Sequence, residues 1–280
     1  MRRRSYILGA GAVVATSLGQ IGTGTADANG AAVETYVIAS GTPSETEVSV
    51  ISSGDGPTTV VTGGIHGDER VGVEAAARIV ERWRPASGSL VVVPRANVTG
   101  IEADRRGWAR GTDDWADLNR QFPAGEEPPE TLPSAIWSLL DEHDPGYLID
   151  LHSAYYMHGR QDGSRRSVGQ ALFRSPAGGD RDRVLNRLNE RYDLANLESH
   201  DGHTCEFVAG NDLGTSDSPL FLRKAGVDRG VEGFLLDTYR ADRPNAAHSL
   251  DDEVEWALTA CAVGLADAGH ELSPEIEEWL

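Results

Sequence analysis

The chain is poor in lysine and in cysteine. Its 25 basic residues include a single lysine, Lys224, against 44 acidic residues, and the formal net charge is −19. Such an acidic surface would repel nucleic acid and anionic membranes, so neither is expected as a partner. An acidic chain almost without lysine is typical of halophilic proteins, because concentrated salt screens the repulsion between charges. The two cysteines, Cys205 and Cys261, leave open whether a disulfide forms.

The chain also lacks an apolar run that is long enough to span a bilayer well. Its first 28 residues combine Arg3 and Arg4 with a short, glycine-containing apolar stretch and a small-residue site that ends at Ala28. This pattern resembles a twin-arginine export signal. We expect cleavage after Ala28, an exported mature domain over residues 29–280, and no stable membrane insertion once the signal is removed.

Strand and helix patterns alternate along this mature part. Residues 29–60 alternate in the manner of strands, and the segment 99–118 reads as a polar loop. Further strands are expected at 88–98, 147–153 and 229–238, and helices at 71–84, 131–144, 180–194, 216–226 and 249–269. The alternation predicts a single α/β domain with a central mixed, mostly parallel sheet flanked by helices. In such sheets, ligands gather beyond the C-terminal ends of the strands.

Three metal-ligating side chains follow predicted strands. In the stretch "TTVVTGGIHGDERVG", a β-branched run leads to His66, and Glu69 follows three residues later. The buried strand "YLIDLHS" brings in His152. Catalytic zinc takes three ligands of these types and leaves a position for water. The sequence therefore predicts a metal site at one edge of the sheet.

Three motifs in this order, "GGIHGDERVG", "ADLNRQFP" and "LIDLHSA", resemble the zinc-dependent carboxypeptidase clan. Their spacing is closest to the succinylglutamate desuccinylase/aspartoacylase branch, and the resemblance covers about residues 58–260. It implies a zinc carboxypeptidase-like fold and one Zn²⁺ per chain, held by His66, Glu69 and His152.

The resemblance also assigns roles around the metal. Asn119 and Arg120 match residues that hold a substrate carboxylate, and Asp117 matches a carboxylate that orients the first zinc histidine. An arginine should stabilise the developing oxyanion. Arg106 is favoured by counting along the motif, with Arg110 as a competitor, because this chain carries extra residues before "DLNR".

The general base is expected to be a carboxylate, either Glu232 or Glu206. Glu232 is preferred because it lies in a predicted buried strand, where an inward carboxylate needs a function. Glu206 lies in a polar loop and is expected at the rim. Tyr155 and His158 follow the "LIDLHSA" motif and are candidates for the wall of the pocket.

These assignments predict a zinc-dependent amidohydrolase that removes the acyl group from an N-acyl amino acid, a small substrate bearing a carboxylate. Glu232 would activate the water bound to the zinc. A zinc carboxypeptidase acting on peptides is the alternative, and a non-catalytic secreted zinc- or ligand-binding protein is a third. The window 206–217, where the peptidase branch has a tyrosine over the substrate, contains none, so the substrate stays open.

Overall fold

The computed structural model describes most of the expected mature domain. The described ranges are residues 25–26, 31–158, 167–197, 204–243 and 246–280. The expected export signal lies outside them apart from Thr25 and Ala26. Within these ranges, no helix has the length and apolar character needed to cross a membrane. Cys205 and Cys261 are both buried and unbonded.

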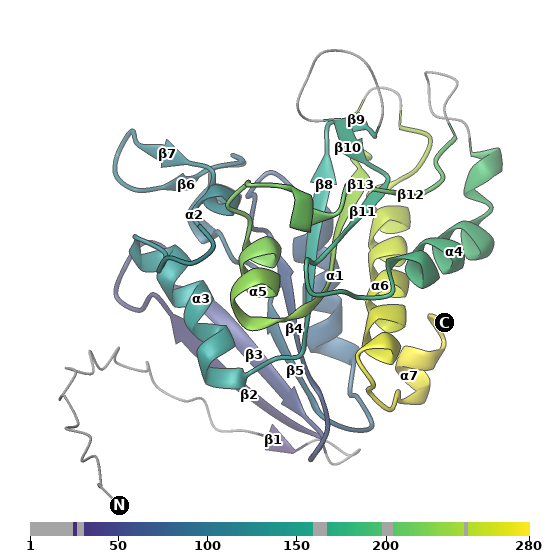
Figure 1. Ribbon diagram of the computed structural model, residues 1–280, viewed down its shortest axis with the longest axis horizontal. Helices are drawn as coiled ribbons and strands as arrows, with labels where there is room; N and C mark the ends of the chain where they lie inside the picture. Colours follow the sequence, from purple (N-terminus) through teal and green to yellow (C-terminus); the bar gives the residue numbers. More distant parts are fainter. Residues whose placement is uncertain (1–24, 27–30, 159–166, 198–203, 244–245) are drawn as a thin grey trace, which may run out of the picture.

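A nine-stranded mixed sheet forms the centre of the molecule, in the order β1-β2-β3-β5-β4-β8-β13-β11-β12 (Figure 1). Its strands are β1 Thr25–Ala26, β2 Ala32–Ile38, β3 Thr46–Ser52, β4 Thr58–Gly63, β5 Ser89–Val93, β8 Tyr147–Ala154, β11 Ala171–Arg174, β12 Val208–Ala209 and β13 Glu232–Tyr239. The four central strands, β5, β4, β8 and β13, run parallel, so their C-terminal ends share one edge. Two short pairs lie outside the sheet, namely β6 Trp108–Ala109 with β7 Trp115–Ala116, and β9 Tyr156–Met157 with β10 Ser167–Gly169.

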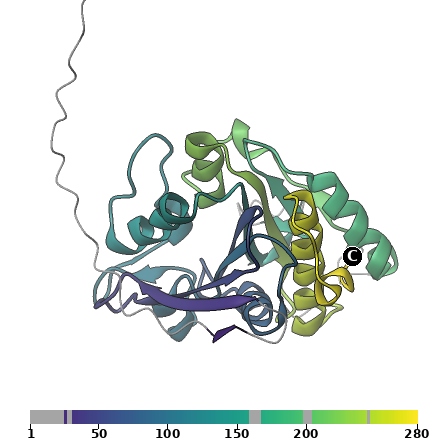
Figure 2. The same cartoon turned by 90° about the horizontal axis from the view of Figure 1, so that it is seen from below.

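Helices cover both faces of the sheet, as Figure 2 shows from below. They are α1 Arg70–Arg82, α2 Val98–Glu102, α3 Thr131–His143, α4 Arg181–Tyr192, α5 Phe221–Arg229, α6 Leu250–Asp267 and α7 Pro274–Glu277. Three 3-10 turns join them, at η1 Leu118–Arg120, η2 Leu194–Asn196 and η3 Leu213–Thr215. One hydrophobic core lies under α1, α4 and α6, and a second lies under α3 and α5. The expected α/β fold class is confirmed.

The helices follow from local sequence signals. In α1, Val71, Ala75 and Ile79 recur at helical spacing, and all three are buried against the sheet. The C-terminal helix α6 starts at a capping box, in which Ser249 and Asp252 satisfy each other's backbone N–H groups. The helix expected at 216–226 begins later, at Phe221, because Leu220 precedes it in extended backbone. It ends at Arg229 and is capped by the left-handed Gly230.

The pairing of β13 with β8 places the two strands that matter most for the site. Gly233 faces Leu148 in this register and has a φ of +133°. A Cβ atom at Gly233 would lie 1.9 Å from the carbonyl oxygen of Leu148. The close approach of these strands therefore requires glycine at this position.

Replacing Gly233 with alanine should consequently destabilise the fold. We expect Gly233→Ala to lower the free energy of unfolding by about 3 kcal/mol, through steric overlap and backbone strain. Gly146→Ala is the matched control, because nothing lies within 4 Å of a Cβ at that position. Urea unfolding of both variants measures the difference, and equal midpoints would contradict the assigned strand packing.

Candidate metal centre and active site

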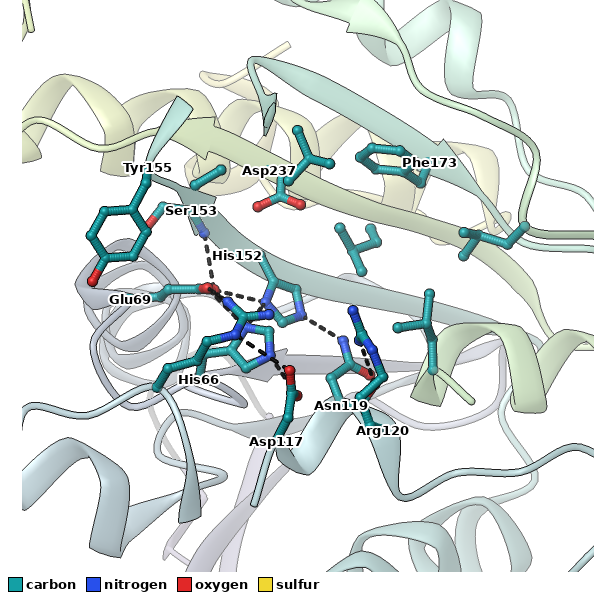
Figure 3. A pocket seen from close by; sticks show the side chains of 16 residues that line it. His66, Glu69, Asp117, Asn119, Arg120, His152, Ser153, Tyr155, Phe173 and Asp237 are labelled. Atoms are coloured by element: carbon teal, nitrogen blue, oxygen red, sulfur yellow. Dashed lines mark hydrogen bonds and ion pairs between the residues drawn. The ribbon is translucent and has the colours of Figure 1, made fainter. Parts of the chain in front are cut away.

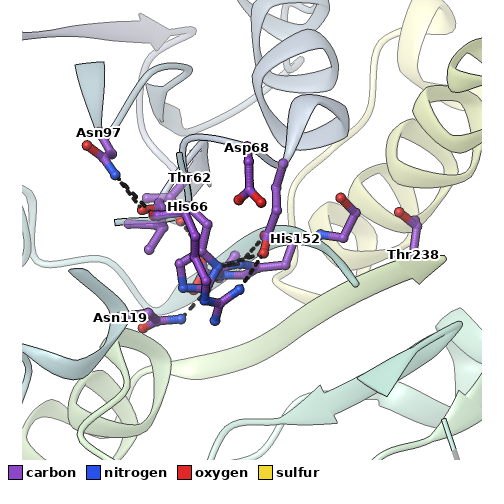
Figure 4. Close-up of polar contacts among 12 residues, drawn as sticks. Thr62, His66, Asp68, Asn97, Asn119, His152 and Thr238 are labelled. Atoms are coloured by element: carbon purple, nitrogen blue, oxygen red, sulfur yellow. Dashed lines mark hydrogen bonds and ion pairs between the residues drawn. The ribbon is translucent and has the colours of Figure 1, made fainter. Parts of the chain in front are cut away.

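The loop between β4 and α1 carries two of the three predicted ligands. His66 lies in this loop, and Glu69 is the residue before the first turn of α1. A Cβ at Gly67 would lie 2.0 Å from the carbonyl carbon of Gly100, so glycine lets the loop pack closely on α2. Asn97 fixes the same contact, because its side-chain amide donates to the carbonyl of Ile65 at 3.3 Å (Figure 4).

The third predicted ligand, His152, lies on β8 beside this loop. Glu69 Oε1 is 2.8 Å from His66 Nδ1, and Glu69 Oε2 is 2.7 Å from His152 Nδ1. The two Nδ1 atoms are 3.0 Å apart, and the ligand atoms of all three residues lie within 4.8 Å of one another. All three side chains are buried. The structure thus brings the three predicted ligands to one point.

The far nitrogens of both histidines face carboxylates. His66 Nε2 is 3.1 Å from Asp117 Oδ1, and His152 Nε2 is 3.0 Å from Asp150 Oδ2. Asp150 is itself fixed by Thr62, whose hydroxyl donates to it at 2.7 Å. A carboxylate behind each imidazole is the arrangement that orients histidine ligands of metals. Two inward Nδ1 atoms and a carboxylate form a donor set that fits Zn²⁺.

Burial and charge act against each other at this cluster. Burial alone would raise the pKa of Glu69, but His66 and His152 hold it well below its ordinary value. Burial alone would lower the pKa of His152, but Asp150 and Glu69 raise it well above its ordinary value. Glu69 also accepts the backbone N–H of Ser153 at 3.1 Å. The carboxylate is therefore held as an anion with its oxygens directed at both histidines.

The cluster forms one end of a cavity of about 280 Å³ (Figure 3). Polar groups line this end, and Asn119, Arg120 and Tyr155 are among them. The other end is apolar and includes Phe173 and Leu235. Tyr155 therefore lies at the pocket as expected, and its hydroxyl donates to Asp68 at 2.6 Å. His158 is not among the lining residues.

Asp237 is a pocket residue that the sequence analysis missed. It lies on β13 directly opposite His152 of β8 and points into the same pocket (Figure 3). Its exposed fraction is 8%. Burial raises the pKa of Asp237 to about 7, which His152 opposes and Glu69 reinforces. Its position near the C-terminal end of a predicted strand could have marked Asp237 as a candidate, because ligands gather at these ends of parallel strands.

The prediction that Glu232 lies inward beside the metal ligands is wrong. Glu232 is the first residue of β13, is exposed, and pairs with Tyr147 at the start of β8. Asp237 lies five positions further along the strand, or about 16 Å away. The competitor Glu206 is half-buried, accepts a hydrogen bond from Thr204, and does not line the cavity either. On β13 it is Asp237, not Glu232, that lines the cavity.

Of the two candidate arginines, one lines the pocket and the other does not. Arg106 lines the pocket and donates to Glu69 Oε1 at 2.9 Å, and its Nε donates to Asp117 Oδ2 at 3.3 Å. Burial would lower the pKa of Arg106, but these two carboxylates raise it. Arg110 instead pairs with Asp114 and Glu130 and does not line the pocket. The expectation that Arg110 competes for the site is therefore not met.

Asn119 and Arg120 lie in η1, at the floor of the pocket. Asn119 is buried, with its amide nitrogen 3.2 Å from His152 Nε2 and its oxygen accepting the N–H of Phe221 at 2.9 Å. Arg120 is exposed and donates to the carbonyl of Asn119 at 2.8 Å. Among the residues that the structure describes, no carboxylate lies within ion-pair distance of Arg120, so its charge is open to a ligand.

The fold is similar to that of solved structures of a carboxypeptidase and of an ectoine utilization protein. The D,L-carboxypeptidase Csd4 of Helicobacter pylori matches with a TM-score of 0.59 at 17% identity, covering 78% of this chain and 52% of that one. The product-bound ectoine utilization protein EutE (DoeB) of Ruegeria pomeroyi matches with a TM-score of 0.54 at 19% identity, covering 90% and 72%. At these identities the likeness establishes the fold alone.

Sequence comparison then narrows the class. Residues 55–155 match the family description "Succinylglutamate desuccinylase/Aspartoacylase catalytic domain". The N-alpha-acetyl-L-2,4-diaminobutyric acid deacetylase of Halomonas elongata is 32% identical over 116 residues, which are 37% of this chain. The match spans a third of the length of that relative, 33%. The resemblance seen in the motifs is therefore confirmed over residues 55–155, which are similar to the catalytic domain of this family.

Proposed function

We propose that the chain is a zinc-dependent amidohydrolase that removes the acyl group from an N-acyl amino acid. The observation that carries this proposal is the convergence of His66, Glu69 and His152 at one end of a pocket. The same pocket presents the guanidinium of Arg120, which has no carboxylate partner among the described residues. The family match over residues 55–155 and the deacetylase among its relatives support an amide-hydrolysing chemistry. His66, Glu69 and His152 would hold one Zn²⁺. When bound, the metal supplies Lewis-acid chemistry, because it polarises a carbonyl and acidifies water.

Asp237 is the proposed general base, in place of Glu232. It is the carboxylate on β13 that lines the pocket, and it is not one of the three residues that would hold the metal. As base it takes a proton from the attacking water and passes it to the leaving amine. Arg106 is the cation nearest to the ligand group and stabilises the negative oxygen that develops on the attacked carbonyl.

Arg120 anchors the substrate carboxylate. Its guanidinium faces the pocket without a carboxylate partner in the described part of the chain, and a planar fork suits a carboxylate. Asn119 supports this end of the pocket, because its side chain joins His152 to the backbone of Phe221. The pocket therefore fixes the carboxylate at one point and the scissile amide at another.

Removal of a ligand should abolish metal binding. We expect about one zinc per chain in the parent protein, and almost none in His66→Ala. Asp150→Asn keeps the ligands but loses the carboxylate behind His152, so zinc affinity should fall by about 10–100-fold. Elemental analysis and chelator competition measure both effects. Glu232→Gln is the control and should retain full zinc, whereas stoichiometric zinc in His66→Ala would overturn the ligand assignment.

Two acidic residues of β13 offer a direct test of the base. Asp237→Asn should bind zinc, fold normally, and lose kcat by about 10²–10⁴-fold with KM little changed, because the amide cannot take the proton. Glu232→Gln, at the opposite end of the same strand, should stay within a few-fold of the parent. Steady-state kinetics on an N-acetyl amino acid measure both values. The reverse pattern would restore Glu232 as the base.

Carboxylate recognition can be tested at Arg120. Arg120→Lys keeps the charge but loses the bidentate fork, so KM should rise about tenfold, as for one lost charge-assisted hydrogen bond. Substrates with an amidated carboxylate should already be poor and should change little. Arg110→Lys is the matched control outside the pocket. An equal effect of Arg120→Lys on both kinds of substrate would show that Arg120 is structural.

A further inference from the structure

The end of the pocket away from the metal ligands is built from hydrocarbon. Five side chains form this apolar wall: Val168, Phe173, Leu213, Leu220 and Leu235. Phe173, Leu213 and Leu235 retain exposed fractions of 9%, 5% and 5%. The wall is continuous with the hydrophobic core under α3 and α5, which makes it a fixed surface.

Part of the apolar wall lies on β13, the strand that carries the proposed base Asp237. Leu235 precedes Asp237 by two residues on β13, so both side chains point to the same face of the sheet. Phe173 of β11 pairs directly with Leu235 across the strands. A molecule that contacts Asp237 beside the three predicted metal ligands therefore also contacts Leu235 and Phe173.

The same wall lies next to the segment of Arg120, the residue proposed to bind the substrate carboxylate. Leu220 immediately precedes Phe221, whose backbone N–H donates to the side-chain oxygen of Asn119 at 2.9 Å. The backbone of Phe122 donates to Pro219 at 3.1 Å, which ties this segment to the turn that carries Arg120. The half of the substrate that bears the carboxylate is consequently the half that lies against the apolar wall.

The charged residues around the wall limit which substrate groups can bind to it. In the described part of the pocket the lining cations are Arg106 and Arg120, and Arg106 is already paired with Glu69 and Asp117. Arg174, next to Phe173, pairs with Asp212 and does not line the cavity. A second carboxylate, or an ammonium group, placed on the wall would lose its hydration without gaining a partner, which is costly.

We infer that the wall is a subsite for an apolar amino-acid side chain, so that the substrates are N-acyl derivatives of aliphatic or aromatic amino acids rather than of acidic or basic ones. This inference rests on the proposed function, because it takes the carboxylate at Arg120 to be that of the amino-acid half. The cavity of about 280 Å³ suits a small acylated amino acid of this kind.

A substrate panel tests the inference on the zinc-loaded protein. N-acetyl-leucine and N-acetyl-phenylalanine should exceed N-acetyl-aspartate and N-acetyl-lysine in kcat/KM by about 10–100-fold. A second series keeps leucine and lengthens the acyl group from acetyl to octanoyl. Preference that follows the acyl chain and ignores the side chain would overturn the assignment, as would a preference for aspartate or lysine.

A charge on the wall should reverse the selection. Leu220→Arg adds a cation at a partly buried position that makes only backbone hydrogen bonds, and should shift preference toward N-acetyl-aspartate by at least about tenfold. Val227→Arg, at an exposed valine of α5, is the matched control and should leave the preference unchanged. An unchanged preference in a folded Leu220→Arg would count against the wall as the subsite.

Binding separates failure of this inference from failure of the proposed function. Calorimetry should detect N-acetyl-leucine binding to the parent and to Asp237→Asn, with much weaker binding of N-acetyl-aspartate. Binding of N-acetyl-leucine without turnover of any substrate would refute the hydrolase and retain the apolar subsite. Turnover with no discrimination between leucine and aspartate in either measurement would refute the subsite and retain the hydrolase.

Discussion

The buried carboxylate of Glu69 is the group on which the rest of the site depends. A charge in the interior is tolerated only when neighbouring groups compensate for its lost hydration. Here two imidazoles, the guanidinium of Arg106 and the backbone N–H of Ser153 all face it. Asp117 and Asp150 in turn face the far nitrogens of His66 and His152. Each member of the cluster is therefore held in place by another member.

Parallel strand pairing converts distant sequence positions into one site. His66 follows β4, His152 lies near the end of β8, and Asp237 lies near the end of β13. These three strands are neighbours in the sheet. Their shared direction brings all the C-terminal ends to one edge. The ion pair between Arg240 and Asp68, at 3.0 Å, joins the chain after β13 to the loop between β4 and α1. The position of Asp237 thus depends on contacts that lie beyond its own strand.

Local patterns predicted much of this arrangement. The strands, most helices and the positions of His66, Glu69 and His152 follow from apolar periodicity and from polar residues at strand ends. The choice of Glu232 failed because its strand contains two acidic residues, and only the direction of β13 relative to β8 decides which of them reaches the pocket. The choice between Arg106 and Arg110 likewise depended on tertiary contacts, since both lie in one polar segment. Asp150 escaped notice although it lies two residues before His152 on the same face of the strand.

The net charge of the chain acts on a substrate at long range, and Arg120 acts on it at short range. Arg120 is the lining cation that has no carboxylate partner in the described part of the pocket. A net charge of −19 repels any anion at long range. At an ionic strength near 1 M the Debye length is only about 3 Å, so this repulsion is screened while direct contact with Arg120 persists. In dilute buffer, a dicarboxylate would be repelled more strongly than a monocarboxylate. Among the described lining residues it would still meet only Arg120 as a cation without a carboxylate partner. The acidic surface and the apolar wall therefore act in the same direction on the proposed substrates, because both disfavour a second carboxylate.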